Sequence, residues 1–337
     1  MLARDFQRIF QDNKDPLNDI LGQESAKRDI KSALISGRHI IIVGPPGVGK
    51  TTLAKNIARL LPKIRVNDCG YNCLPENPVC PSCKSGVKVK TKEISGEDRF
   101  IRVQGSPDLT AEDLFGDIDP IKAMKFGPLS LEAFTPGKIF RANNGILFFD
   151  ELNRCPDKLQ NALLQVLEEG RITIGSYEVE FPANFIFIGT MNPEDRSTEP
   201  LSDVFLDRFD ITYMTYPESL EVETEIVKRK GLKLAEFPEA LLKFTISFVR
   251  ELRQNKDLEK LPSVRASIGL YERAQANAIL SGRDIVSIED VASAVISVLS
   301  HRIGLKPASK FLTSPEELIK KEFERAREDF ERKGGCL

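Results

Sequence analysis

The segment GPPGVGKT, residues 44–51, constrains the fold of this chain more than any other stretch of it. It follows a short apolar run, RHIIIVG, and precedes TTLAKNIARLL, whose apolar residues have helical spacing. A strand, a glycine-rich loop and a helix in this order predict a P-loop, in which backbone N–H groups and the helix N-terminus face phosphate groups. The predicted nucleotide-binding residues are Gly44, Pro45, Pro46, Gly47, Val48, Gly49, Lys50, Thr51 and Thr52.

The chemistry of phosphoryl transfer assigns a role to the polar residues of this loop and to a second motif. Lys50 reaches the terminal phosphates, and the Thr51 hydroxyl binds Mg²⁺. Residues 145–151, GILFFDE, are an apolar strand that ends in two acids. We expect Asp150 to hold Mg²⁺ through water and Glu151 to polarise the attacking water.

Asn192 ends the next apolar run, NFIFIGTMN. Its side-chain amide is suited to orienting the attacking water or sensing the γ-phosphate. The alternative is a turn-forming asparagine before Pro193, because asparagine is frequent in turns.

Strands and helices alternate up to about residue 216, which predicts an α/β fold with a parallel sheet flanked by helices. Helical periodicity in CPDKLQNALLQVLEEG is followed by RITIGSYEVEF, which predicts a hairpin at 171–181. The remainder is helical and predicts a smaller all-α lid domain, with a last helix whose apolar stripe packs on its own chain rather than on a neighbouring subunit. The expected divisions are 1–216, 217–305 and a C-terminal helical tail at 306–337.

The overall composition limits the classes of function. Among 337 residues the formal net charge is −2, so no basic field favours nucleic acid. The apolar runs are far too short to cross a bilayer, and the start lacks the apolar run of a signal peptide. We therefore expect a soluble, cytoplasmic protein without a membrane span.

Four of the six cysteines lie within residues 69–83, CGYNCLPENPVCPSC, whereas Cys155 and Cys336 are isolated. This spacing, C-x₃-C followed by C-x₂-C, is unlike a disulfide framework and supplies the four ligands of a tetrahedral metal site. The predicted ligands are Cys69, Cys73, Cys80 and Cys83.

The identity of the ion at these cysteines stays open between structural Zn²⁺, which we favour, and an iron–sulfur cluster. Disulfides and unpaired thiols are the further alternatives. Three prolines between the ligands preclude a regular helix there; they are Pro75, Pro78 and Pro81. We expect the cysteine loop, residues 67–86, to be a metal-folded clip at the periphery, remote from the hydrolysis chemistry.

Several motifs occur together in an order that resembles one clade of the AAA+ ATPases. They are GQESAKRDI, the P-loop, LFGDID, PGKIFRANNGILFFDELN, GTMNPE and LDRFD. Over roughly residues 15–305 the chain is similar to the clade that holds the magnesium chelatase ATPase subunit and the MoxR proteins. This resemblance implies an ATPase that forms a ring, usually hexameric, with ATP at each subunit interface.

The resemblance also implies roles for two arginines and two projecting segments. Arg208, in LDRFD, corresponds to the arginine finger, and Arg265, in PSVRAS, to the sensor 2 arginine of the lid. Whether Arg265 acts on its own subunit's ATP or on a neighbour's stays open. Without the resemblance, either arginine would be read as a surface ion-pair partner. An insert at residues 105–144 and the hairpin at 171–181 are expected to project toward the ring's pore or a partner.

Three hypotheses remain for the process that ATP hydrolysis drives. The first is a MoxR-like motor that remodels or activates a protein client, for example one with a von Willebrand A domain. The second is the ATPase subunit of a magnesium or cobalt chelatase, which acts with separate partner subunits in tetrapyrrole metallation. The third is a nucleic-acid motor, which the near-neutral charge and the lack of an aromatic-basic groove disfavour.

Overall fold

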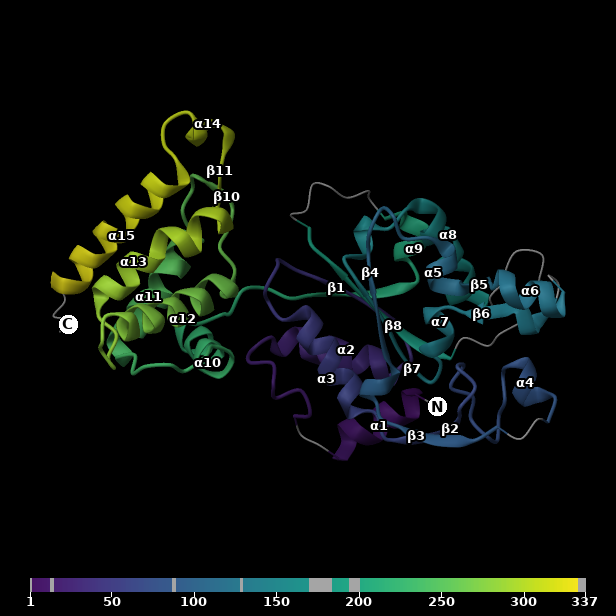
Figure 1. Ribbon diagram of the computed structural model, residues 1–337. Coiled ribbons are helices and arrows are strands. Elements are labelled where there is room, and N and C mark those ends of the chain that lie inside the picture. Colours follow the sequence, from purple (N-terminus) through teal and green to yellow (C-terminus); the bar gives the residue numbers. More distant parts are fainter. Residues whose placement is uncertain are drawn as a thin grey trace. The chain divides into compact units, whose positions relative to one another are not determined.

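The computed structural model describes residues 2–12, 15–86, 89–127, 130–169, 184–193 and 201–332 (Figure 1). The chain divides into two compact units, Met1–Gly44 with Gly49–Met214, and Pro45–Val48 with Thr215–Leu337. The hairpin predicted at 171–181 and Cys336 lie outside the described residues. Within the described ranges, no helix has the length and apolarity that a membrane crossing requires.

The first unit is built on a five-stranded sheet with the strand order β4-β7-β8-β1-β9. Each neighbouring pair in this order is parallel. The strands are β1 (His39–Val43), β4 (Phe100–Gln104), β7 (Gly145–Asp150), β8 (Phe185–Met191) and β9 (Phe209–Tyr213). Their apolar runs suit strands that are covered on both faces. The predicted α/β fold with a parallel sheet is confirmed.

Helices cover both faces of this sheet, with α2 and α3 on one side and α8 and α9 on the other (Figure 1). The two helices predicted in this unit are observed as α3 (Lys50–Leu60) and α8 (Asp157–Glu169). The others named here are α1 (Leu2–Asp12), α2 (Glu24–Ile35) and the short α9 (Asp203–Leu206).

The cysteine loop connects two strands of an antiparallel ribbon, β2 (Ile64–Asn67) and β3 (Thr91–Ile94). It contains the one-turn helix α4 (Pro81–Lys84), so the expectation that the three prolines exclude a helix was wrong at this end of the loop. Pro81 is compatible with the helix because it occupies the first turn, where no intrahelical N–H bond is lost.

The insert contains several short elements ahead of β7. Its small sheet pairs β5 with β6 in antiparallel fashion. The elements are α5 (Ala111–Phe115), β5 (Gly116–Ile118), α6 (Pro120–Phe126), β6 (Phe134–Pro136) and α7 (Lys138–Arg141).

The second unit is mainly helical, as the sequence predicted, and α15 packs on its own core through the buried side chains of Leu318, Ile319 and Phe323. A short antiparallel ribbon, β10 (Leu258–Lys260) with β11 (Gly304–Leu305), was not predicted. The helices are α10 (Leu220–Lys230), α11 (Glu239–Leu252), α12 (Val264–Leu280), α13 (Ile288–Leu299), α14 (Pro307–Lys310) and α15 (Pro315–Arg332).

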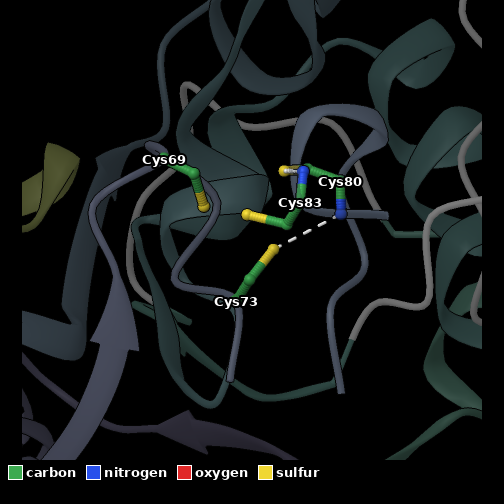
Figure 2. Close-up of side chains that lie close together, drawn as sticks. All are labelled: Cys69, Cys73, Cys80 and Cys83. Carbon is green, nitrogen blue, oxygen red and sulfur yellow. Dashed lines mark hydrogen bonds between the residues drawn. The ribbon is translucent and has the colours of Figure 1, made fainter. Parts of the chain in front are cut away.

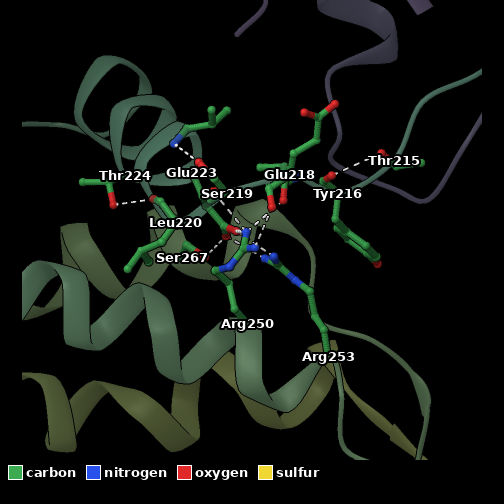
Figure 3. A network of polar contacts seen from close by, with 12 residues as sticks. Thr215, Tyr216, Glu218, Ser219, Leu220, Glu223, Thr224, Arg250, Arg253 and Ser267 are labelled. Atoms are coloured by element: carbon green, nitrogen blue, oxygen red, sulfur yellow. Dashed lines mark hydrogen bonds and ion pairs between the residues drawn. The ribbon is translucent and has the colours of Figure 1, made fainter. Parts of the chain in front are cut away.

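A buried charge network ties the start of α10 to α11 and α12 (Figure 3). The fully buried Glu223 carboxylate accepts hydrogen bonds from Arg253 at 2.6 and 2.7 Å, from Arg250 at 3.2 Å and from Ser267 at 2.6 Å. Burial raises the pKa of Glu223, but the Arg253 and Ser267 hydrogen bonds outweigh it and hold that pKa below its usual value. The carboxylate therefore stays charged, and removing one partner would leave a buried charge uncompensated.

Candidate active site

The carboxyl ends of the parallel strands bring the predicted catalytic residues to one edge of the sheet. The P-loop follows β1, the acidic pair follows β7, and Asn192 follows β8. Parallel strands place their carboxyl ends together, which is where ligands bind in open α/β sheets. Gly49, at the N-cap of α3, has φ 101°, a left-handed conformation that favours glycine. Residues 45–48 form the loop between β1 and α3, and Thr52 lies in the first turn of α3.

The predicted Mg²⁺ ligands lie within reach of each other. The Thr51 hydroxyl donates to Asp150 Oδ2 at 3.4 Å, and Thr190 Oγ1 donates to Asp150 Oδ1 at 2.6 Å. Lys50 Nζ lies 2.5 Å from the Gly44 carbonyl oxygen, at the mouth of the P-loop. A hydroxyl and a carboxylate are the hard oxygen ligands that Mg²⁺ prefers, so these residues fit the ion.

Glu151 is held in an uncommon conformation by its neighbours. Its φ of 57° and ψ of 53° are left-handed, and its N–H donates to Thr190 Oγ1 at 3.0 Å. Its carboxylate Oε2 accepts from Gln104 Nε2 at 3.0 Å and pairs with Arg154 Nη1 at 2.9 Å. Backbone strain of this kind concentrates at functional sites. The side chain is thus fixed directly beside the predicted Mg²⁺ ligand.

Two residues at the end of β4 were not found by sequence reasoning. Arg102 Nη2 donates to Asp150 Oδ2 at 2.6 Å, and Gln104 binds Glu151. The register of β4 and β7 pairs Gln104 with Asp150, which brings both side chains to the acidic pair. The segment RFIRVQG could have indicated Gln104, because a polar residue followed by glycine at the end of a strand is typical of a site at the carboxyl edge of a sheet. Gly105 is needed there, since a Cβ would lie 2.0 Å from the Glu151 carbonyl oxygen.

Asn192 lies at the same edge as the P-loop. β8 pairs with β1 so that Met191 is opposite Val43, and the Gly44 N–H donates to the Met191 carbonyl at 3.1 Å. The Asn192 carbonyl accepts from Asn153 Nδ2 at 3.4 Å. This position suits the predicted role of Asn192 toward the γ-phosphate, which stays a prediction.

Arg208 lies at the opposite edge of the sheet. It directly precedes β9, whose first residue, Phe209, pairs with His39 at the start of β1. A five-residue strand spans about 16 Å, so roughly this length separates Arg208 from the P-loop of its own chain. Its guanidinium pairs with Glu168 and with Asp207, the latter at 3.1 Å. The arginine-finger role of Arg208 stays a prediction.

Arg265 lies in the first turn of α12, and its side chain is exposed. Burial and, to a smaller degree, the positive charge of Arg265 lower the pKa of Arg302. The sensor 2 role of Arg265, and whether it acts in cis or in trans, stay predictions.

The four clustered cysteines converge in the structure (Figure 2). Their Sγ atoms all lie within 4.8 Å of one another, and all four are free of disulfides. The Cys73 sulfur accepts from the N–H groups of Val79 at 3.4 Å and Cys80 at 3.3 Å. The cluster therefore offers four ligand atoms, with backbone N–H groups that stabilise negative charge on sulfur.

The ionisation of these thiols is interdependent. A hydrogen bond from the Cys73 thiol lowers the pKa of Cys69 to about 5, and the same bond raises the pKa of Cys73. Burial raises the pKa of Cys80 to about 11. The Cys69 thiol therefore ionises more readily than those of Cys73 and Cys80, and a bound cation would favour the thiolate form of the cysteines that coordinate it.

The expectation that this loop is peripheral was wrong. Cys73 and Cys80 are buried in the same apolar core as Phe140 of α7 and Phe149 of β7. The sequence suggested periphery because the loop is polar and proline-rich. Its contacts with the insert depend on the tertiary fold, which a local pattern does not show.

A phosphate-binding loop whose lysine and threonine stand beside an aspartate–glutamate pair, at the carboxyl edge of a parallel sheet, defines a P-loop nucleoside triphosphatase. Comparisons with known proteins place the chain within this class. Models described as "ATPase family associated with various cellular activities (AAA)", "AAA lid domain" and "Magnesium chelatase, subunit ChlI" match residues 80–211, 252–322 and 16–71, respectively.

Two relatives and one solved structure show the extent of the similarity. The magnesium-chelatase subunit ChlI homolog of Methanocaldococcus jannaschii is 31% identical, over 94% of this chain and 91% of that protein. The chloroplastic magnesium-chelatase subunit ChlI of Glycine max is 29% identical, over 87% of this chain and 75% of that protein. The RuvB Holliday junction branch migration motor of Thermotoga maritima shares the fold, with a TM-score of 0.50. The match covers 84% of this chain and 72% of the RuvB chain, at 19% identity. The chain therefore belongs to the magnesium chelatase ChlI family of AAA+ ATPases, and it is an ATP hydrolase.

Proposed function

We propose that this chain forms a homo-oligomeric, hexameric ring that uses ATP hydrolysis to remodel or activate a partner protein. The observation that carries the proposal is the placement of Arg208, about one strand length from the P-loop of its own chain. An arginine finger so placed completes a site only when a second subunit contributes it. Residues 217–305 would act as the lid of each subunit, and residues 306–337 as its tail.

Within each ATP site, different residues of the chain bind the phosphates, hold the metal ion and activate the attacking water. When bound, Mg²⁺ neutralises charge on the ATP phosphates. Lys50 holds the terminal phosphates, and Thr51 and Asp150 hold the ion. Glu151 orients and polarises the attacking water, with Gln104 and Arg154 fixing its carboxylate. Thr51 and Arg102 both donate to Asp150 Oδ2, so Arg102 lies beside the place where Mg²⁺ would be held.

The partner is proposed to be a protein, either a von Willebrand A-domain protein or the further subunits of a metal chelatase. The second candidate is a chelatase role in tetrapyrrole metallation. The Methanocaldococcus jannaschii and Glycine max relatives, which are named magnesium-chelatase subunits, favour the chelatase part of this candidate. Nucleic acid is disfavoured, since the net charge is −2.

A Glu151→Gln variant tests the partner proposal, because it is expected to hold ATP without turnover and so to retain a partner. In extracts of the source organism, affinity-tagged Glu151→Gln protein with ATP should retain one protein specifically. Mass spectrometry identifies it, and the Lys50→Ala variant, which is expected not to bind ATP, is the matched control. Equal recovery by both variants would contradict ATP-dependent engagement.

We also propose that the four thiolates bind one structural Zn²⁺, with an iron–sulfur cluster as the alternative. The mutual sulfur distances and the N–H···S bonds support a tetrahedral thiolate site. Free, clustered cysteines also favour a reducing, cytoplasmic compartment.

Purified protein is expected to contain about one Zn²⁺ per chain, since four thiolates complete one tetrahedral site. A Cys80→Ser/Cys83→Ser variant should lose the ion and become protease-sensitive around residues 65–95, because the ion's binding energy folds such a loop. Elemental analysis and limited proteolysis measure both effects, and Cys155→Ser, outside the cluster, serves as control. Iron with visible absorbance would indicate a cluster instead, and absence of both metals would refute the site.

A further inference from the structure

The cysteine loop is hydrogen-bonded to the segment that leads from the insert into β7. Asn72, which lies between two of the cysteines, donates from Nδ2 to the Arg141 carbonyl at 2.7 Å. In return, Asn143 Nδ2 donates to the Tyr71 carbonyl at 3.0 Å, and Asn144 Nδ2 donates to the Asn72 carbonyl at 3.1 Å. The loop and the end of the insert are therefore joined by reciprocal side chain–backbone bonds.

Asn144 extends this connection to the amino ends of three neighbouring strands. It precedes β7 directly, and its carbonyl accepts from Arg99, which directly precedes β4, at 2.5 Å. Its N–H donates to the carbonyl of Asn184, which directly precedes β8, at 2.7 Å. The Asn184 side chain returns a hydrogen bond to Asn144 Oδ1 at 2.7 Å. The contact with the cysteine loop thus acts on a junction of β4, β7 and β8.

Apolar packing reinforces these bonds. The Tyr71 ring meets the Phe140 ring of α7 edge-on, with centroids 5.4 Å apart. Cys73 and Cys80 are buried in the same core as Phe140 and Leu114 of α5. The two buried thiols therefore belong to the same apolar core as the insert.

The geometry of Asn72 depends on the residues at either side of it. Its φ is 47°, a left-handed conformation that costs free energy for a residue other than glycine. Cys69 and Cys73 bracket it, so one ion bound to both would close a short chelate ring around Asn72. Without an ion bound to both cysteines, the connection between β2 and β3 can adopt many more conformations. Forming the bond from Asn72 to Arg141 then costs more conformational entropy.

From these contacts we propose that the metal-bound cysteine loop is a clamp that holds α7 and residues 142–144 at the start of β7. The inference rests on the proposed zinc site. Metal binding at that site then determines how well the insert is ordered. The order of the insert in turn determines how well ATP hydrolysis is coupled to a partner protein. The ATP site lies at the other end of β7, about 20 Å away, so basal hydrolysis does not depend on the ion.

Hydrogen–deuterium exchange of the full chain, zinc-loaded and chelator-treated, tests this proposal, with zinc content measured on each sample. The protected amides of Ala142, Asn143, Asn144 and Gly145 are expected to exchange at least about tenfold faster after zinc removal. Amides in β1 should be unchanged. Zinc loss without faster exchange at these four amides overturns the clamp but leaves the zinc site standing. Protein that contains neither zinc nor iron overturns the site and the clamp together.

Asn72→Gly tests the clamp without touching a ligand, since glycine keeps the left-handed backbone and removes only the side-chain amide. It should retain about one Zn²⁺ per chain and still show roughly fivefold faster exchange at these four amides, the expected effect of one lost hydrogen bond. Asn77→Gly is the matched control, because Asn77 is an exposed residue of the same loop whose turn bond runs from its backbone to Leu74. Equal exchange in Asn72→Gly and Asn77→Gly would overturn the proposal.

Discussion

Arg208→Ala protein is expected to bind ATP with near-normal affinity and to hydrolyse it about a thousandfold more slowly, because arginine fingers supply at least this factor. The guanidinium stabilises charge that develops on the transferring phosphoryl group, so its loss affects the transition state more than the ground state. Equilibrium binding of a fluorescent ATP analogue and steady-state phosphate release measure the two effects separately.

Mixed rings test whether Arg208 acts across a subunit interface. Arg208→Ala and Glu151→Gln subunits each hydrolyse poorly alone, but some interfaces in a mixed ring combine an intact Glu151 with an intact Arg208. Co-assembly should therefore restore measurable hydrolysis, and verified mixed rings without any rescue would count against action in trans. Arg38→Ala is the matched control, because Arg38 precedes β1 at the same edge and also forms an ion pair with an acidic residue, Asp210, at 3.3 Å.

Glu151→Gln is the second substitution with a large expected effect. The variant should retain ATP binding and lose at least about a hundredfold in turnover, since general-base catalysis contributes roughly 10²–10⁴-fold. The amide keeps the shape of the side chain but cannot accept a proton from water. Single-turnover hydrolysis and nucleotide binding, measured on the same preparation, report the two quantities, and normal hydrolysis would refute the role.

Lys50→Ala provides the contrasting result in the same site. Lys50 contacts phosphate in the ground state, so this variant should fail to bind ATP at all. Glu97→Gln is a matched control, because Glu97 is an exposed glutamate in an ion pair with Arg59, outside the site. Together the three variants separate binding from chemistry.

Residues that function within one short segment were predictable from the sequence, and residues brought together by tertiary structure were not. The P-loop and the acidic pair each have their polar residues in adjacent positions after an apolar strand, so spacing alone was enough to predict them. The four cysteines were predictable for the same reason. Arg102 and Gln104 were missed because their role depends on the register of β4 against β7. The contact of Asn72 with Asn144 joins distant parts of the chain, which no local pattern encodes.

The network around Glu223 shows the same limit in the second unit. Glu223 lies in a charged helix segment, LEVETEIVKRK, where an exposed side chain would be the ordinary expectation. It is instead fully buried, because Arg250 on α11 and Arg253 at the C-cap of α11 supply its partners. Helical periodicity indicated the helix, but not which of its glutamates would be buried with arginines from another helix.

The position of β1 within the sheet has a consequence for how the protein is made. Both neighbours of β1 are encoded far downstream, and β9 ends at Tyr213. At ribosomal speeds of about 5–20 residues per second, β8 is completed roughly 7–30 s after the HIIIV segment, and β9 later still. During that interval it is an unpaired apolar edge, which invites aggregation. Nascent chains of this ATPase are therefore expected to need a holding chaperone until β9 has left the ribosome.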